Sequence, residues 1–265
     1  MLQTELPSTA EICRLLDGGA IRRVGIVGVP PLAVIDSLNQ REIEILDLDA
    51  MLIKADMEST VTILPRVYCA ILRTVVLNAM HLDLQAIFID TGPGKCDSAL
   101  YVATILADHL SIPVIKTVNR DREPFGYPLC RCEMDLTEKF MTITEGVKRA
   151  RLTGAEPPPC KPSAGFWGVP PRDFSILAPF PATTHVYGWT RCMENKTPAD
   201  LALEMHINPA IPTVFFAQSF CAKTALARHL ARQHPRALAL DIDVHTTSSA
   251  KAKIQAFLEL SGVTA

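Results

Sequence analysis

The chain has 265 residues, a formal net charge of −2 and a hydrophobic content of 48 %. This length allows one large or two small domains, and the charge balance indicates neither nucleic-acid binding nor disorder. No apolar run is long enough to span a membrane, and residues 1–19 lack the basic start and apolar core of a secretory signal. The sequence therefore predicts a cytoplasmic protein that binds neither nucleic acid nor membrane.

Short apolar runs alternate with amphipathic stretches along the whole chain. The runs interpreted as strands are 23–28, 43–48, 86–90, 112–118, 174–178, 184–189, 212–217 and 237–242. The stretches interpreted as helices are 9–17, 31–39, 66–81, 97–110, 133–151, 198–205, 222–233 and 248–260. Buried strands that alternate with helices are typical of a parallel sheet covered on both faces. The sequence thus predicts an α/β fold.

Two segments of the chain occur twice in the same order. The tetrapeptide Gly-Val-Pro-Pro stands at 28–31 and again at 168–171. Further along, 86–118 and 213–242 share an apolar run, a short loop with a cysteine, an Ala/Leu-rich amphipathic stretch, a proline and a second apolar run. Such repetition indicates internal duplication. We expect two Rossmann-like lobes with parallel sheets, and a symmetric homodimer is compatible with this design.

The duplication divides the chain into three predicted parts. The first α/β lobe covers 1–118 and the second covers 165–265. The connector between them, 119–164, is rich in proline, cysteine and charge and contains one predicted helix.

Polar residues follow several of the predicted strands. In open α/β sheets, ligands bind at the carboxyl ends of the strands. We expect a small anionic substrate there, oriented by three cationic side chains that we regard as catalytic candidates: Lys95, Arg120 and Arg122. The candidate cofactor-binding residues are Gly92, Gly94, Asn119, Gln218 and Ser219. Residues 91–98 lack the spacing of an ATP-hydrolysing P-loop, although the helix start that they precede can bind an anion.

Cysteines form the second group of candidates. Eight of them in a protein predicted to be cytoplasmic favour ligation or catalysis over a disulfide framework. Cys13 and Cys69 lie inside amphipathic stretches and are interpreted as core residues. The other six lie in predicted loops or at helix starts, and the favoured metal ligands among them are Cys96, Cys192, Cys221, Cys130 and Cys132, with Cys160 last. Thiolates in this number would suit a [4Fe–4S] cluster or another soft metal. A redox or nucleophilic cysteine and simple burial remain alternatives.

The Cys96-Asp97 and Phe220-Cys221 segments resemble parts of the 2-hydroxyacyl-CoA dehydratase / benzoyl-CoA reductase family. The resemblance covers the two repeated segments, about a quarter of the 265 residues. It implies tandem Rossmann-like lobes that hold a [4Fe–4S] cluster through cysteines at strand ends. It also carries ligation onto Cys96 and Cys221, and further onto Cys192.

Three functions follow as hypotheses. The first is a reductase- or dehydratase-like enzyme of anaerobic metabolism with a metal or cluster in a cysteine-lined cleft between the lobes. The second is a metal-free enzyme that binds a nucleotide-like ligand and uses Cys96 or Cys221 as its nucleophile. The third is a non-catalytic maturation or partner protein of an anaerobic metalloenzyme.

Overall fold

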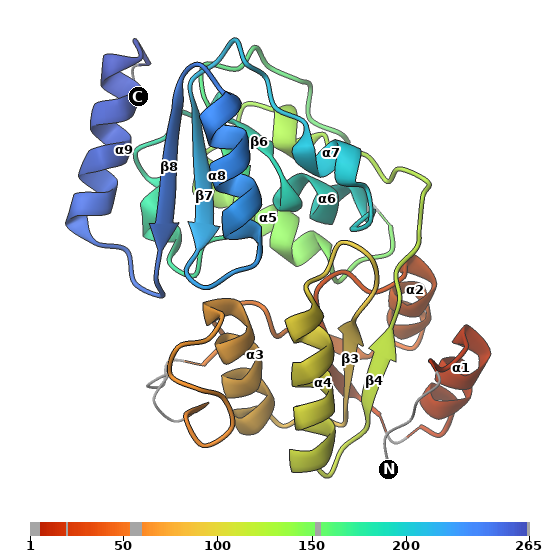
Figure 1. Ribbon diagram of the computed structural model, residues 1–265. Helices are drawn as coiled ribbons and strands as arrows, with labels where there is room; N and C mark the ends of the chain where they lie inside the picture. The colour runs from red at the N-terminus through yellow and green to blue at the C-terminus, as the bar shows by residue number, and fades with distance from the viewer. Residues whose placement is uncertain (1–5, 20, 54–59, 152–154, 264–265) are drawn as a thin grey trace. The chain divides into compact units, whose positions relative to one another are not determined.

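The computed structural model describes residues 6–19, 21–53, 60–151 and 155–263 (Figure 1). As far as these residues are described, the chain forms two compact units. The first unit spans Met1–Pro124, Glu145–Thr153 and Lys196–Ala199. The second spans Phe125–Thr144, Gly154–Asn195 and Asp200–Ala265. The predicted connector 119–164 is therefore shared between the units, and each unit is described by itself below.

Each unit contains a sheet of four parallel strands. In the first unit the strand order is β2-β1-β3-β4, with β1 (Arg23–Val27), β2 (Glu44–Asp47), β3 (Ala86–Asp90) and β4 (Val114–Thr117). In the second unit it is β6-β5-β7-β8, with β5 (Gly165–Gly168), β6 (His185–Tyr187), β7 (Thr213–Gln218) and β8 (Ala237–Ile242). The two orders are the same, so the predicted α/β fold with two Rossmann-like lobes is confirmed.

Helices connect the strands in both units. The first unit contains α1 (Thr9–Asp17), α2 (Leu32–Gln40), α3 (Ala70–His81) and α4 (Asp97–His109). The helix α5 (Leu136–Gly146) begins in the second unit, which also contains α6 (Trp189–Asn195), α7 (Leu201–Met205), α8 (Lys223–Gln233) and α9 (Ser248–Leu260). Two short 3₁₀ helices, η2 (Leu129–Arg131) and η3 (Phe174–Leu177), complete the second unit.

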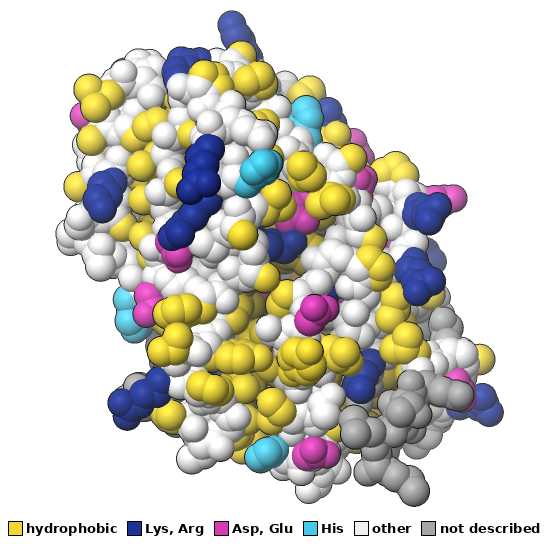
Figure 2. All heavy atoms as spheres, viewed as in Figure 1, with side chains coloured by type: hydrophobic (Ala, Val, Ile, Leu, Met, Phe, Trp, Pro, Cys, Tyr) yellow, Lys and Arg dark blue, Asp and Glu magenta, His cyan; other side chains and the backbone are white. Residues whose placement is uncertain are grey.

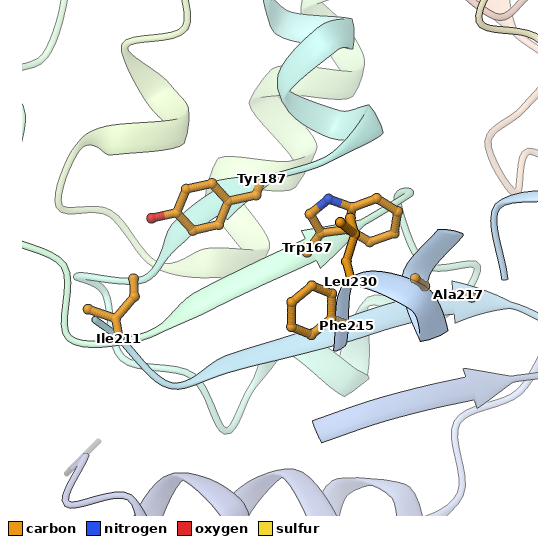
Figure 3. Packing of buried hydrophobic residues seen from close by; sticks show 7 residues of the cluster. Trp167, Tyr187, Ile211, Phe215, Ala217 and Leu230 are labelled. Atoms are coloured by element: carbon orange, nitrogen blue, oxygen red, sulfur yellow. The ribbon is translucent and has the colours of Figure 1, made fainter. Parts of the chain in front are cut away.

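Aromatic side chains cover both faces of the second sheet. On one face, Trp167 and Phe215 pack with Leu230 of α8, as Figure 3 shows. On the other face, the Phe166 ring lies 5.1 Å from the Phe140 ring of α5 and 5.6 Å from that of Phe216. Because successive side chains of a strand point to opposite faces, adjacent aromatic residues on β5 and β7 supply both layers of the core.

Two sequence predictions in the second unit are wrong. The run 174–178, interpreted as a strand, forms η3, because the Asp173 side chain accepts a hydrogen bond from the Ser175 N–H (2.9 Å) and so starts a turn. The strand of this region is instead β5 (Gly165–Gly168), which leads into the second Gly-Val-Pro-Pro segment. The segment 190–195, interpreted as a loop, belongs to the buried helix α6. Its polar side chains bond to backbone groups, as when Thr190 Oγ1 donates to the Gly168 carbonyl at 3.0 Å.

One face of the first unit exposes apolar side chains. Figure 2 shows hydrophobic atoms gathered over α3 and α4. The exposed large apolar side chains of α3, α4 and the segment before α3 are Val67, Met80, Leu100 and Tyr101, of which Val67 and Tyr101 are 68 % and 60 % exposed. No helix within the described ranges is both long enough and apolar enough to cross a membrane.

Candidate functional site

The strand order of the first unit defines where its ligand site is expected. From β1 the chain passes to β2 on one side, and it then returns to β3 on the other side of β1. In sheets of this kind, ligands bind at the carboxyl ends of the two strands where the direction of winding reverses. In the first unit these ends carry residues 28–31, which follow β1, and residues 91–96, which follow β3.

The turn after β1 is already occupied by carboxylates. Asp49 Oδ2 accepts a hydrogen bond from the Gly28 N–H (2.6 Å), and Asp121 Oδ2 accepts one from the Leu32 N–H (2.8 Å) at the start of α2. Pro30 and Pro31 have no N–H to offer. Two N–H groups of this turn, which is the usual phosphate site in a dinucleotide-binding lobe, therefore bond to carboxylates, whose charge disfavours an anion.

The loop after β3 has the opposite character. It leads into α4, a helix of 13 residues whose N-cap is Cys96 and whose first turn receives no side-chain cap. The N–H groups of such a first turn and the helix dipole favour an anion. Lys95 directly precedes this N-cap and adds a positive charge. The loop and the helix start, whose first turn also contains Asp97, are thus the candidate place for an anion in this unit.

A row of polar groups crosses the carboxyl end of the first sheet. Asp90 and Thr117 are register partners at the ends of β3 and β4, Gly28 directly follows β1, which pairs with β3, and Asp49 accepts the hydrogen bond from the Gly28 N–H. Gly28 has no side chain, and a Cβ built on it would collide with Cε and Nζ of Lys95. The lysine side chain therefore fills the gap in the row.

Asp90 is fully buried in this row. Its Oδ1 accepts hydrogen bonds from the N–H groups of Gly92 (3.1 Å) and Asn119 (2.9 Å). Burial raises the pKa of Asp90, while the charge of Lys95 and the two N–H donors lower it in part. The carboxyl group is thus held at the strand end by backbone groups of two loops.

The structure places the predicted residues of the first unit as follows. Asn119 is buried, and its Nδ2 donates to the carbonyls of Val29 (3.0 Å), Pro30 (3.3 Å) and Lys196 (3.3 Å). It braces the loops rather than facing a ligand. Gly92 packs against it, since a Cβ on Gly92 would lie 3.0 Å from the Asn119 nitrogen.

The two arginines of this region are exposed. Arg120 and Arg122 follow Asn119 on the loop after β4 and have no burial that would fix their side chains. Gly94 has φ +86°, and its backbone lies against Pro198. A Cβ at this position would collide with the Pro198 carbonyl. Lys95, Gly92, Gly94 and Asn119 therefore lie at one edge of the sheet, and the two arginines continue from it.

The corresponding end of the second sheet is closed by its own side chains. Gln218 Oε1 accepts from the Arg172 N–H (3.1 Å), and its Nε2 donates to the carbonyls of Ile242 and Asp243 (both 2.8 Å). Ser219 Oγ donates to Asp241 Oδ1 at 3.0 Å. These two predicted cofactor-binding residues therefore hold the strand ends together.

Cys96 and Cys221 occupy nearly equivalent places in the two units. Each lies between the third strand of its sheet and the helix that follows. Cys96 is the N-cap of α4, whereas Cys221 stands one residue before Ala222, the N-cap of α8. The Cys221 N–H donates to the Gln218 carbonyl at 3.0 Å. Both thiols are half-buried.

The other predicted ligands are buried thiols of the second unit. Desolvation raises the pKa of Cys130 and of Cys132, and it raises the pKa of Cys192 to about 12. Cys132 Sγ donates to the Leu129 carbonyl (3.3 Å) and Cys192 Sγ to the Asp200 carbonyl (3.7 Å). Metal ligation requires the thiolate, which burial disfavours.

The described residues contain no group of three or more His, Cys, Asp or Glu side chains placed to hold a metal ion. Within each unit, then, the cysteines do not fit a cluster. The [4Fe–4S] or soft-metal hypothesis stays a prediction, and iron and sulfide analysis after anaerobic purification is the measurement that decides it.

The pKa of Cys192 leads to an expected pH dependence. A thiol whose pKa rises from 9.0 to about 12 on folding contributes stability below pH 9.0 and loses it above. The stability difference between wild type and Cys192→Ala should therefore fall by about 1.4 kcal/mol between pH 8 and pH 10. Urea unfolding followed by tryptophan fluorescence measures it, because both tryptophans lie in the second unit. The same difference at both pH values would contradict this assignment.

A cluster of buried charges in the second unit escaped the sequence predictions. Glu194 accepts hydrogen bonds from the N–H groups of Leu129 (2.8 Å) and Cys130 (2.9 Å) at η2. The buried Arg191 lies with its guanidinium carbon 4.2 Å from the centre of the Tyr187 ring. Lys139 donates to the carbonyls of Cys132 (2.9 Å) and Thr184 (2.6 Å). These hydrogen bonds all join the side chains to backbone groups of the same unit. We therefore interpret the cluster as part of the core.

The fold and the site together define an α/β protein of two doubly wound lobes, of which the first carries a loop suited to an anion. No family model and no curated protein matches the chain. The resemblance to the dehydratase / reductase family therefore stays a prediction.

Proposed function

We propose that the first unit binds a small anionic molecule at the carboxyl end of its sheet. The anionic group lies against residues 91–96 and the first turn of α4, with Lys95 as its positive partner. The observation that carries the proposal is the contrast between the two loops. At the turn after β1, two N–H groups donate to Asp49 and Asp121. The first turn of α4, by contrast, receives no side-chain cap.

The ligand-binding role does not depend on a cluster. Within each unit the cysteines are not arranged as a ligand set, so no step through a metal is proposed. Of the three hypotheses from the sequence, the arrangement favours the ligand class of the second, a nucleotide-like or other phosphorylated molecule, and it leaves the role of the cysteines a prediction.

Inorganic phosphate is the simplest probe of this proposal. We expect the wild-type protein to bind it, with shifts of the backbone amide signals of Asp97 and Ser98 in NMR spectra. Lys95→Met should bind at least about tenfold more weakly, because a hydrogen bond to a charged group contributes roughly 1.5–3 kcal/mol. Calorimetric titration at constant ionic strength gives the affinities.

Lys116→Met is the matched control. Lys116 lies half-buried on β4, outside the loop, so this variant should bind phosphate like the wild type. Circular dichroism confirms that each variant is folded. Failure of the wild type to bind phosphate, or equal binding by Lys95→Met, would refute the proposal.

A further inference from the structure

Two buried polar atoms in the row across the first sheet have no hydrogen-bond partner among the described residues. They are Asp90 Oδ2 and Thr117 Oγ1. Both residues are buried, with exposed fractions of 0 % and 4 %. Buried polar atoms of folded proteins are nearly always paired, so an orphaned atom indicates a group that the chain itself does not supply.

The two orphaned atoms are neighbours. Asp90 and Thr117 are register partners on β3 and β4, so their side chains point to the same face of the sheet. Paired strands lie about 4.8 Å apart, which places both side chains within reach of one small group. Asp90 also holds the loop that carries the anion site, through the Gly92 N–H.

The chemistry of the two atoms selects the group. A carboxylate oxygen accepts hydrogen bonds, whereas a threonine hydroxyl can both donate and accept. A single hydroxyl group satisfies both atoms at once, since it donates to Asp90 Oδ2 and accepts from Thr117 Oγ1. A carboxylate or phosphate oxygen would instead be repelled by ionised Asp90.

We propose that the molecule bound by the first unit is a hydroxylated anion, such as a sugar or polyol phosphate, whose hydroxyl group bonds to Asp90 and Thr117. This inference rests on the proposed function, because it assumes that the anionic group lies at the start of α4. It adds the substrate class and two residues that determine specificity.

Lys95 provides the route to these buried atoms. Its side chain lies over Gly28 beside Asp90, and its charge lowers the Asp90 pKa. Since a lysine side chain is long and flexible, it can turn toward the arriving anion and uncover Asp90. The same movement then couples binding of the anion to binding of the hydroxyl.

Three phosphates separate the contributions: inorganic phosphate, propyl phosphate and glycerol 3-phosphate. The last two have three-carbon chains, and only glycerol 3-phosphate carries hydroxyls on its chain. We expect the wild type to bind glycerol 3-phosphate about tenfold or more tightly than propyl phosphate. Thr117→Val preserves the shape of the side chain and should abolish most of this preference. Asp90→Asn should reduce it as well, the preference of each variant being the ratio of its own affinities for glycerol 3-phosphate and propyl phosphate.

Thr104→Val is the control, because Thr104 Oγ1 donates to the Leu100 carbonyl within α4 (3.0 Å), away from the row. It should leave the preference unchanged. Equal binding of glycerol 3-phosphate and propyl phosphate by the wild type would overturn the inference alone, as would an unchanged preference in Thr117→Val. Binding of none of the three phosphates would overturn the proposed function and this inference with it.

Discussion

Replacing Glu194 by alanine should destabilise the second unit by about 3–5 kcal/mol, since each buried donor left without an acceptor costs roughly 1–3 kcal/mol. The change leaves the N–H groups of Leu129 and Cys130 without their acceptor. It also leaves the buried guanidinium of Arg191 without the nearby carboxylate that it stabilises. Urea unfolding followed by tryptophan fluorescence is the measurement, since Trp167 and Trp189 are the only tryptophans of the chain.

Two further variants test whether the loss of stability in Glu194→Ala comes from the buried cluster. Glu138→Ala removes an exposed glutamate of α5 and should change the unfolding free energy by less than about 0.5 kcal/mol. Glu194→Gln keeps the size and one acceptor oxygen, so its stability should lie between those of the wild type and Glu194→Ala. If Glu194→Ala unfolds like Glu138→Ala, the buried cluster does not stabilise the unit.

Gly94→Ala should have a comparably large effect on the first unit. Gly94 has φ +86°, where an alanine is strained, and its Cβ would meet the backbone of Pro198 rather than a side chain that could move away. Backbone strain and overpacking each cost about 1–3 kcal/mol, so we expect a loss of about 3–5 kcal/mol. The loop 91–96 should also lose its phosphate affinity, because its geometry depends on this turn.

Two other glycines separate the causes of that effect. Gly19 has φ +68° and open space around its Cβ position, so Gly19→Ala reports the strain alone, about 1–2 kcal/mol. Gly146 has neither a positive φ nor a close neighbour, and Gly146→Ala should be near neutral. Unfolding followed by circular dichroism covers the whole chain, and the fluorescence signal identifies the part due to the second unit. A loss in Gly94→Ala no larger than in Gly19→Ala would contradict the close contact with Pro198.

The repeated sequence pattern was sufficient to predict the architecture. The duplicated landmarks and the alternation of apolar runs with helices predict two parallel sheets, which the structure shows. The errors arose where tertiary contacts override local pattern. The run at 174–178 is apolar enough for a strand, yet the Asp173 carboxylate turns the backbone. The polar segment 190–195 forms a buried helix because backbone and side-chain partners elsewhere satisfy its polar groups.

The candidate site was predicted in part. Lys95, Gly92, Gly94 and Asn119 were selected because they follow strands, and the structure brings them to one edge of the first sheet. Asp49, Asp90 and Thr117 were not selected, because their alignment depends on strand register, which composition and spacing do not reveal. For the cysteines, the sequence did not reveal burial: Cys130, Cys132 and Cys192 lie in the core of the second unit.

The first glycine of the Gly-Val-Pro-Pro repeat has different neighbours in the two lobes. Gly28 and Gly168 both follow from the Gly-Val-Pro-Pro repeat. A Cβ on Gly28 would meet Lys95 of the loop after β3, whereas a Cβ on Gly168 would meet the backbone of Phe216. The first position thus leaves room for a lysine side chain, and the second permits close packing against the neighbouring strand.

The path of the chain through the first unit has a consequence for biosynthesis. Lys196–Ala199 belongs to this unit, where Pro198 packs against Gly94 and the Lys196 carbonyl accepts from Asn119. A ribosome that has released only the first 124 residues has therefore not yet delivered every part of the lobe. Because translation proceeds at roughly 5–20 residues per second, the nascent first lobe waits several seconds for its last segment. The first unit is thus completed only after 62 of the 128 residues of the second unit have been synthesised.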